Sequence, residues 1–184
     1  MRRLLFASVV GLASGLLVQI GAARAEPATV ARTVPKLLVQ ASLLSNYEIA
    51  AGELALGRAE DPRLRHFAAQ MVAAHRHMAA QIGHLAFIYG VALPASATSA
   101  NQRSSLSSLA AAPAGPAFDQ AYVLAEVRSH VDAINLFSTY SIEGRAPAAV
   151  DFAVHSLSTD HAHYTKAERL WESMGAVATV ALRR

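Results

Sequence analysis

The chain has 184 residues and no cysteine, with 16 Lys and Arg residues against 13 Asp and Glu residues. The absence of cysteine excludes disulfides, thiolate metal sites and thiol redox chemistry. A chain of this length can still bury a hydrophobic core large enough to fold without disulfides.

The N-terminal residues have the pattern of a secretory signal peptide. Arg2 and Arg3 precede an apolar stretch from Leu4 to Ile20, and an Ala-x-Ala sequence ends at Ala25. The pattern predicts cleavage after Ala25, with residues 26–34 as a linker. A retained membrane anchor is the alternative, because 17 residues just suffice to span a bilayer. We therefore expect an exported, periplasmic protein with at most peripheral membrane association.

Cleavage would also change the charge balance. Three basic residues and no acidic ones lie in residues 1–25, so 13 of each sign remain afterwards. A neutral chain lacks the basic surface that nucleic-acid binding needs, so we expect no nucleic-acid partner. Phosphate-binding glycine loops and Gly-x-Ser-x-Gly motifs are also absent from the sequence. A protein partner and the oligomeric state stay open.

The first half of the chain contains two long amphipathic segments. One runs from Pro35 to Ala59, and the next begins at Asp61-Pro62, an N-cap followed by proline at the first helical position, and ends at Gly90. Apolar residues recur at spacings of three and four, which predicts helices. The two apolar stripes are Leu37, Ala41, Leu44, Ala51 and Ala55 in the first segment, and Leu64, Ala68, Met71, Met78, Ile82, Leu85 and Tyr89 in the second.

The second half repeats this arrangement after a long connection. Residues 91–115 are rich in Pro, Ser and Ala, with one short helix expected near residues 103–110. Two further helices are predicted, over residues 116–143 and 147–175, followed by a flexible tail over residues 176–184. Their apolar stripes are Val123, Val127, Ile134 and Phe137, then Val150, Val154, Leu157, Tyr164 and Trp171.

These segments predict an all-α fold, a ferritin-like four-helix bundle over residues 35–175. Two short turns make two antiparallel hairpins, and the long connection between helices 2 and 3 can cross the length of the bundle. An up-down-up-down bundle is the alternative. We expect Phe67, Phe118, Phe137 and Trp171 in the core.

Each predicted helix carries one polar residue on its apolar stripe: Glu48, His75, His130 and His161. At about 1.5 Å per residue, all four lie near the same level, at the middle of the bundle. Burial of such residues without partners is costly. We therefore predict either one metal site, holding a single transition metal (Zn, Fe, Mn or Cu), or a metal-free cluster of hydrogen-bonded polar groups.

Neighbouring polar residues have two interpretations each. Glu126 is either a second carboxylate of the site or, as the pattern favours, an exposed acid. Tyr164 is either a hydrogen-bond partner of the site or a core tyrosine. Asp160 and His163 are expected to face away from the seam. We expect three further histidines to be solvent-exposed, namely His66, His77 and His84.

Several blocks of the sequence resemble a family of secreted bacterial proteins, the domain of unknown function 4142. The blocks are SNYEIAAGELAL, DPRLRHFAAQMVAAH, GVALP, AFDQAYVLAEVRSH and TDHAHYTKAERL, and they extend from about Pro35 to Trp171. The resemblance implies a ferritin-like bundle, with glutamate at Glu48 and histidines at His75, His130 and His161. Members are usually described as candidate outer-membrane proteins. The family often has Asp before the second-helix histidine, where this chain has Ala74.

The resemblance implies a fold and a compartment more than an activity. Ferritin-like di-iron enzymes use Glu-x-x-His pairs, and the residues three before the seam histidines are Val72, Val127 and Ser158. A redox enzyme acting on peroxide or oxygen is therefore less expected than a non-catalytic protein in envelope or stress physiology. A metal-free structural or interaction module is the other alternative.

Overall fold

The computed structural model describes the backbone of residues 33–181 and the side chains of residues 33–175. The predicted signal peptide, most of the linker and the last three residues lie outside this range. The described chain forms five helices: α1 (Val34–Arg58), α2 (Pro62–Tyr89), α3 (Ala100–Ala111), α4 (Pro116–Glu143) and α5 (Pro147–Ala181). The predicted all-α fold is confirmed, including the short helix α3 in the long connection.

Local sequence sets the ends of the helices. The Thr33 side chain accepts a hydrogen bond from the Lys36 amide at the start of α1, and the Asp61 side chain accepts one from the Arg63 amide at the start of α2. Gly90 ends α2 in the left-handed conformation, with φ 64°. The buried carboxylate of Asp119 accepts the amide N–H groups of Glu60 at 3.1 Å and of Asp61 at 3.0 Å. These two bonds fix the α1–α2 turn to α4.

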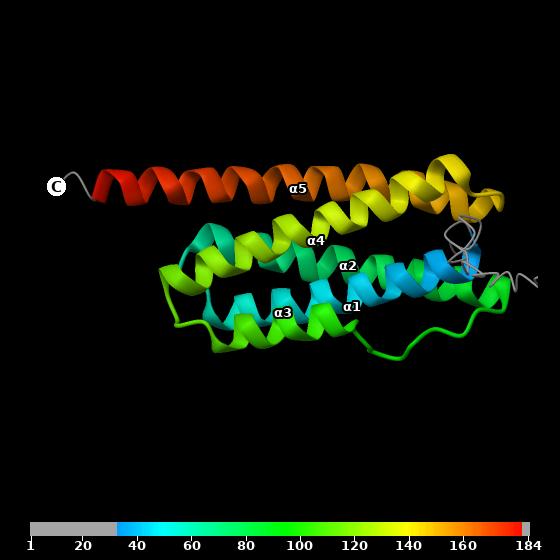
Figure 1. Cartoon of the computed structure of the whole chain (residues 1–184), viewed down its shortest axis with the longest axis horizontal. Helices are drawn as coiled ribbons and strands as arrows, with labels where there is room; N and C mark the ends of the chain where they lie inside the picture. Colours follow the sequence, from blue (N-terminus) through cyan, green and yellow to red (C-terminus); the bar gives the residue numbers. More distant parts are fainter. Residues whose placement is uncertain (1–32, 182–184) are drawn as a thin grey trace, which may run out of the picture.

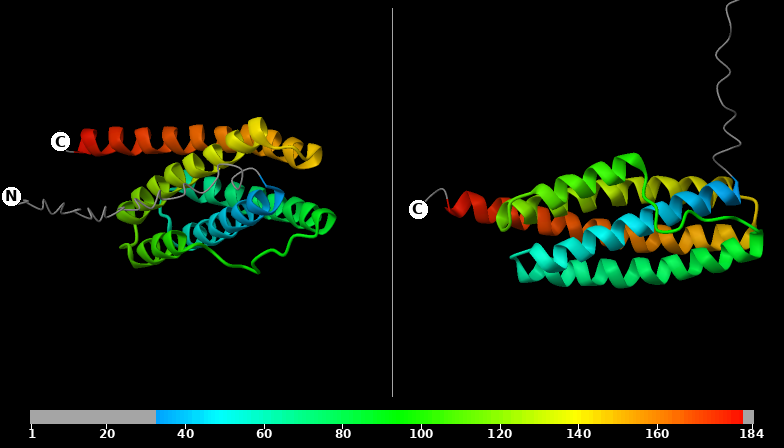
Figure 2. Two further views of the ribbon diagram at one scale, coloured as in Figure 1. Left: turned by 45° about the vertical axis from the view of Figure 1, so that its right-hand side comes forward. Right: turned by 90° about the horizontal axis from the view of Figure 1, so that it is seen from below.

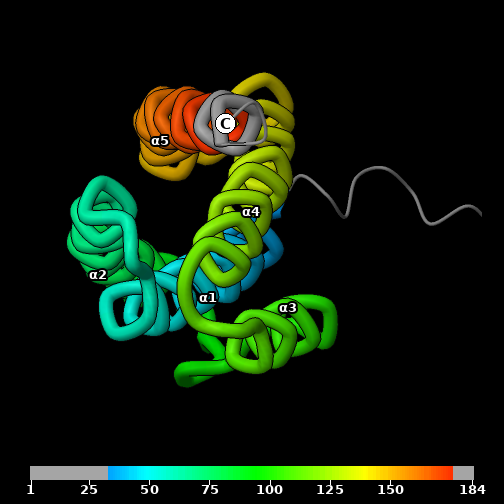
Figure 3. The backbone as a smooth tube through the Cα atoms, turned by 90° about the vertical axis from the view of Figure 1, so that its left-hand side faces the viewer, coloured from blue at the N-terminus to red at the C-terminus, as the bar shows by residue number. Residues whose placement is uncertain are grey.

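The helices form two antiparallel hairpins, α1–α2 and α4–α5, packed into one bundle (Figures 1 and 2). Helix α1 packs on α4, and α2 packs on α5. Helices α2 and α4 run in the same direction, so their connection returns along the length of the bundle. Helix α3 lies on this return path, outside α1 and α4 (Figure 3). The single crossover is confirmed, and the up-down-up-down alternative is wrong.

Two apolar clusters fill the two ends of the bundle. One contains Ile82 and Phe137, and the other contains Phe67 and Phe118. The core positions predicted for Phe67, Phe118 and Phe137 are confirmed. Between the two clusters lies a layer of buried polar side chains from α1, α2, α4 and α5. The polar residues therefore occupy the middle of the bundle, as their sequence positions predicted.

The predicted buried face of the last helix is wrong. Val154 and Trp171 are 50% and 44% exposed, although both were assigned to the apolar stripe. The buried positions of α5 are Ala149, Phe152, Ala153, Ser156, Asp160, His163 and Ala167. This face is made mostly of small or polar residues. Small residues let α5 approach its neighbours closely, but they are weakly hydrophobic. A pattern based on hydrophobicity therefore predicts a different buried face.

The predicted end of the last helix is also wrong. Helix α5 continues through Gly175 to Ala181, so most of the segment assigned to a flexible tail is helical. None of the described helices contains a stretch that is apolar and long enough to cross a membrane.

Candidate metal centre

Four buried side chains from three helices converge at the middle of the bundle. His75 comes from α2, His130 from α4, and Asp160 and His163 from α5. One ligand atom from each lies within 4.8 Å of those of the other three. The residues are 2%, 1%, 0% and 8% exposed, respectively. Three imidazoles and one carboxylate are a donor set that transition metals accept in proteins.

A backbone hydrogen bond fixes the tautomer of His130. Its Nδ1–H donates to the Glu126 carbonyl oxygen at 2.8 Å. Because a carbonyl oxygen only accepts, Nδ1 carries a proton, and in the neutral ring the lone pair is on Nε2. Nε2 lies 4.0 Å from Asp160 Oδ1. This is the arrangement of metal-binding histidines, in which one nitrogen is held by the protein and the other is free to coordinate.

Most of the remaining donor atoms of this group are buried without hydrogen-bond partners. They are both ring nitrogens of His75, Nε2 of His130, both carboxylate oxygens of Asp160 and Nδ1 of His163. Buried polar atoms almost always have a partner. The void at His75, His130 and Asp160, lined also by Glu48 and Phe137, is too narrow for a water molecule. A metal ion fits this requirement better than water does, because it bonds to several donor atoms at once.

Burial also places the histidines in the ionisation state that coordinates metals. Burial lowers the pKa of His75 to about 4. Burial, followed by the nearby rings of His130 and His75, lowers the pKa of His163 to about 3. Both rings are therefore neutral near physiological pH. Burial raises the pKa of Asp160 to about 7, although His130 acts in the opposite direction. A metal ion would have to displace a proton from Asp160 at lower pH.

Two further carboxyl groups lie beside His130. Glu48 of α1 and Glu126 of α4 are 2% and 0% exposed, and their ligand atoms lie within 4.8 Å of each other and of His130. Glu126 Oε2 is 3.9 Å from His130 Nδ1. Burial, then the charge of Glu48, raises the pKa of Glu126 well above its usual value. The Tyr122 pKa is also raised, by burial and then by the charges of Glu126 and Glu48.

The structure brings together three of the four predicted site residues. Glu48, His75 and His130 are buried at one level, as predicted, whereas His161 is exposed. The prediction that His161 lies on the seam is therefore wrong. The prediction that His163 and Asp160 face away from the seam is wrong for the same reason. The shifted buried face of α5 explains both errors. The spacing of three between Asp160 and His163 puts them on one helix face, and this spacing was the available clue.

The neighbouring residues also differ from their interpretations. Glu126 is fully buried rather than exposed. Tyr164 is part-exposed on α5, and its pKa is raised first by a hydrogen bond to Glu168. Tyr164 is therefore not a core residue and has its partner on its own helix. The exposure predicted for His66, His77 and His84 is confirmed.

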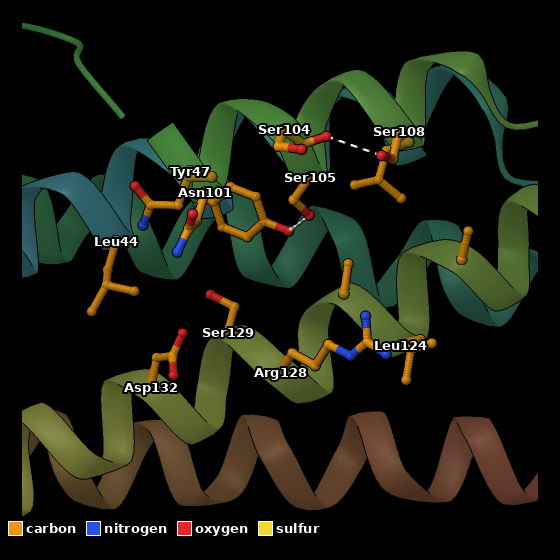
Figure 4. A pocket seen from close by; sticks show the side chains of 14 residues that line it. Leu44, Tyr47, Asn101, Ser104, Ser105, Ser108, Leu124, Arg128, Ser129 and Asp132 are labelled. Carbon is orange, nitrogen blue, oxygen red and sulfur yellow. Dashed lines mark hydrogen bonds between the residues drawn. The ribbon is translucent and has the colours of Figure 1, made fainter. Parts of the chain in front are cut away.

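A cavity of about 380 Å³ lies next to the centre, between α3 and the α1–α4 pair (Figure 4). The Tyr47 hydroxyl and the Ser105 hydroxyl share a hydrogen bond of 2.9 Å across it. Leu44 and Ser129 line both this cavity and the void at the buried histidines. The cavity therefore approaches the centre from the side that α3 covers.

Comparison with known proteins gives the family of the chain. The domain of unknown function DUF4142 matches residues 20–170. The chain belongs to this family. No curated protein matches it.

Solved structures with the same fold include a copper-bound protein. CopM in its Cu(II)-bound form has a TM-score of 0.64 at 15% identity, covering 76% of this chain and 96% of its own. A DUF305 fragment from Deinococcus radiodurans has a TM-score of 0.63 at 14% identity, covering 74% and 96%. A DUF305 protein from Streptomyces coelicolor, described as a candidate secreted protein, has a TM-score of 0.63 at 9% identity, covering 79% and 96%. At these identities the likeness shows the fold alone.

Proposed function

We propose that this protein binds one transition-metal ion at the middle of the bundle, through His75, His130, His163 and Asp160. The observation that carries the proposal is the convergence of these four side chains, with ligand atoms within 4.8 Å of one another and most of those atoms lacking hydrogen-bond partners. A metal-free polar cluster would require the groups to satisfy one another. The distance of 4.0 Å between His130 Nε2 and Asp160 Oδ1 is too long for that.

The donor set favours a borderline transition metal. Imidazole nitrogen suits Zn, Cu, Fe and Ni, and the affinity of a nitrogen-oxygen site is highest for Cu²⁺ with Zn²⁺ following it. The similarity in fold to Cu(II)-bound CopM supports the proposal that a bundle of this kind can hold such an ion. We therefore expect Cu²⁺ or Zn²⁺ in preference to Mg²⁺ or Ca²⁺, which prefer oxygen ligands.

The surroundings of the centre favour metal holding over catalysis. The four ligands can complete a tetrahedral shell, and the void beside them has no room for a water molecule. Catalytic metal sites keep an open position for water or substrate, whereas closed sites with four protein ligands are structural or storage sites. A redox enzyme acting on peroxide or oxygen would need such an open position. We propose that the protein acts in the periplasm, in metal handling or stress physiology of the envelope.

Metal content per chain tests this function. Protein purified without chelators or affinity tags is analysed by elemental mass spectrometry, together with His75→Ala and His130→Ala. We expect close to one equivalent of one metal in the parent and less than a tenth in the two variants. His77→Ala and His84→Ala are matched controls, because both remove an exposed histidine from α2. Equal loss from controls and ligand variants, or a folded parent without metal, would contradict the proposal.

A further inference from the structure

We propose a second, oxygen-donor cation site beside the first, formed by the carboxylates of Glu48 and Glu126 and selecting a hard divalent ion such as Mn²⁺ or Mg²⁺. The two glutamates and His130 form a second group of neighbouring ligand atoms, separate from the group that contains Asp160, although Glu48 also lines the void at His75, His130 and Asp160. This proposal rests on the proposed function, since the second ion would lie next to the ion that the histidine-rich group binds. It adds a site with a different metal preference.

The first argument is the number of oxygen atoms without partners. Glu48 Oε2 and both carboxylate oxygens of Glu126 are buried without hydrogen bonds. A third oxygen-bearing side chain lies beside them. Tyr122 is 0% exposed, its hydroxyl makes no hydrogen bond within normal distance, and it interacts with the Glu126 carboxyl group and with the charge of Glu48. Three buried oxygen-bearing side chains from α1 and α4 thus lie close together.

The second argument is charge. The polar layer holds three carboxyl groups, those of Glu48, Glu126 and Asp160, and the described part of the chain buries no Lys or Arg side chain. With all three carboxylates ionised, one divalent ion leaves the layer with a net charge of −1, which attracts a second cation, and a second divalent ion brings the net charge to +1. An uncompensated buried charge is costly.

The third argument is the chemistry of the donors. His130 cannot serve both sites, because its Nδ1 proton is held by the Glu126 carbonyl oxygen. The ligands on the glutamate side are therefore oxygens. Carboxylate oxygens suit Mg²⁺ and Mn²⁺, whereas imidazole nitrogens suit Zn²⁺ and Cu²⁺. The two halves of the centre accordingly differ in the metals they prefer.

The test uses two metals in sequence. Metal-free protein is first loaded with one equivalent of Zn²⁺ and then titrated with Mn²⁺, while electron paramagnetic resonance measures the free Mn²⁺ that remains in solution. We expect about one Mn²⁺ bound per chain on top of the Zn²⁺. The Glu126→Gln variant should bind Mn²⁺ at least tenfold more weakly and still hold its Zn²⁺. Circular dichroism confirms that the variant remains helical.

Glu53→Gln is the matched control. It removes one negative charge from α1, but Glu53 is exposed and paired with Arg76, so Mn²⁺ binding should be unchanged. Zn²⁺ binding without Mn²⁺ binding, or equal Mn²⁺ affinity in Glu126→Gln and the parent, overturns the second site and leaves the first intact. A parent that takes up no Zn²⁺, Cu²⁺ or other transition metal overturns the proposed function itself. The two failures are therefore distinguishable.

Discussion

Substitution of His75 by leucine should stabilise the metal-free protein and destabilise the metal-loaded one. His75 is 2% exposed, its ring is neutral, and both ring nitrogens lack hydrogen-bond partners. Each unsatisfied buried polar atom costs about 1–3 kcal/mol. Leucine fills a similar volume and carries no polar atom, so we expect a gain of about 2 kcal/mol without metal, after some loss in packing. For a chain of this size that raises Tm by about 4–8 °C.

The metal reverses the order of the two proteins. A ligand at about 1,000 times its Kd adds about 4 kcal/mol to the stability of the native state, which raises the Tm of the parent by about 8–16 °C. His75→Leu loses a ligand and should gain little. The assay is thermal unfolding followed by circular dichroism, once with EDTA and once with excess Zn²⁺.

Exposed His77 on the same helix provides the control, and His77→Leu should leave Tm close to the parent value in both conditions. The reasoning fails if His75→Leu melts several degrees below the parent in EDTA. That result would mean that His75 has stabilising partners without metal, as a structural polar network requires. A metal-induced shift of equal size in both proteins would also contradict it.

Three other predictions concern binding and stability. Zn²⁺ affinity should fall about tenfold per pH unit below pH 7, because Asp160 has a pKa of about 7 and must lose its proton. His75 and His163 are already neutral above about pH 5, so they should not make the pH dependence of Zn²⁺ affinity steeper. Zn²⁺ titrations at pH 5.5, 6.5 and 7.5 measure this dependence. Asp119→Ala should lower the free energy of unfolding in urea by about 3 kcal/mol, through loss of two bonds to the α1–α2 turn, and unchanged stability would show that the turn holds without them. Gly52→Ala should cost about 1–3 kcal/mol, because its methyl group would lie 2.7 Å from a side chain of α2; a variant as stable as the parent would mean that the two helices separate easily.

The sequence predicted most of the fold because apolar residues recur at helical spacings in each long segment and proline or glycine marks the turns between them. In α2, buried positions recur regularly from Leu64 to Leu85, and His75 falls among them. Similar distances from the two turns then sufficed to place Glu48, His75 and His130 near one level. Those inferences needed only helix geometry and the short turns.

The buried face of α5 could not be predicted in the same way. On α5 the large apolar residues Val154 and Trp171 are largely exposed, while Ala153 and Ala167 are buried. Close helix packing selects small residues at such positions, and a hydrophobicity pattern cannot detect that selection. Because the wrong face of α5 was predicted to be buried, His161 was predicted in the site in place of His163. Burial of Glu126 was missed for a related reason, since a carboxyl group is expected outside unless its partners are known.

The most direct test of the metal centre compares His163→Ala with His161→Ala. The two histidines are two positions apart on α5, one buried in the centre and the other exposed. Zn²⁺ or Cu²⁺ affinity is measured for both variants and the parent by competition with a chelator of known strength. The structure predicts that metal affinity falls at least about a hundredfold in His163→Ala, because a direct ligand is lost. The affinity of His161→Ala should equal that of the parent. Loss of binding in His161→Ala with retention in His163→Ala would contradict the assignment of the site.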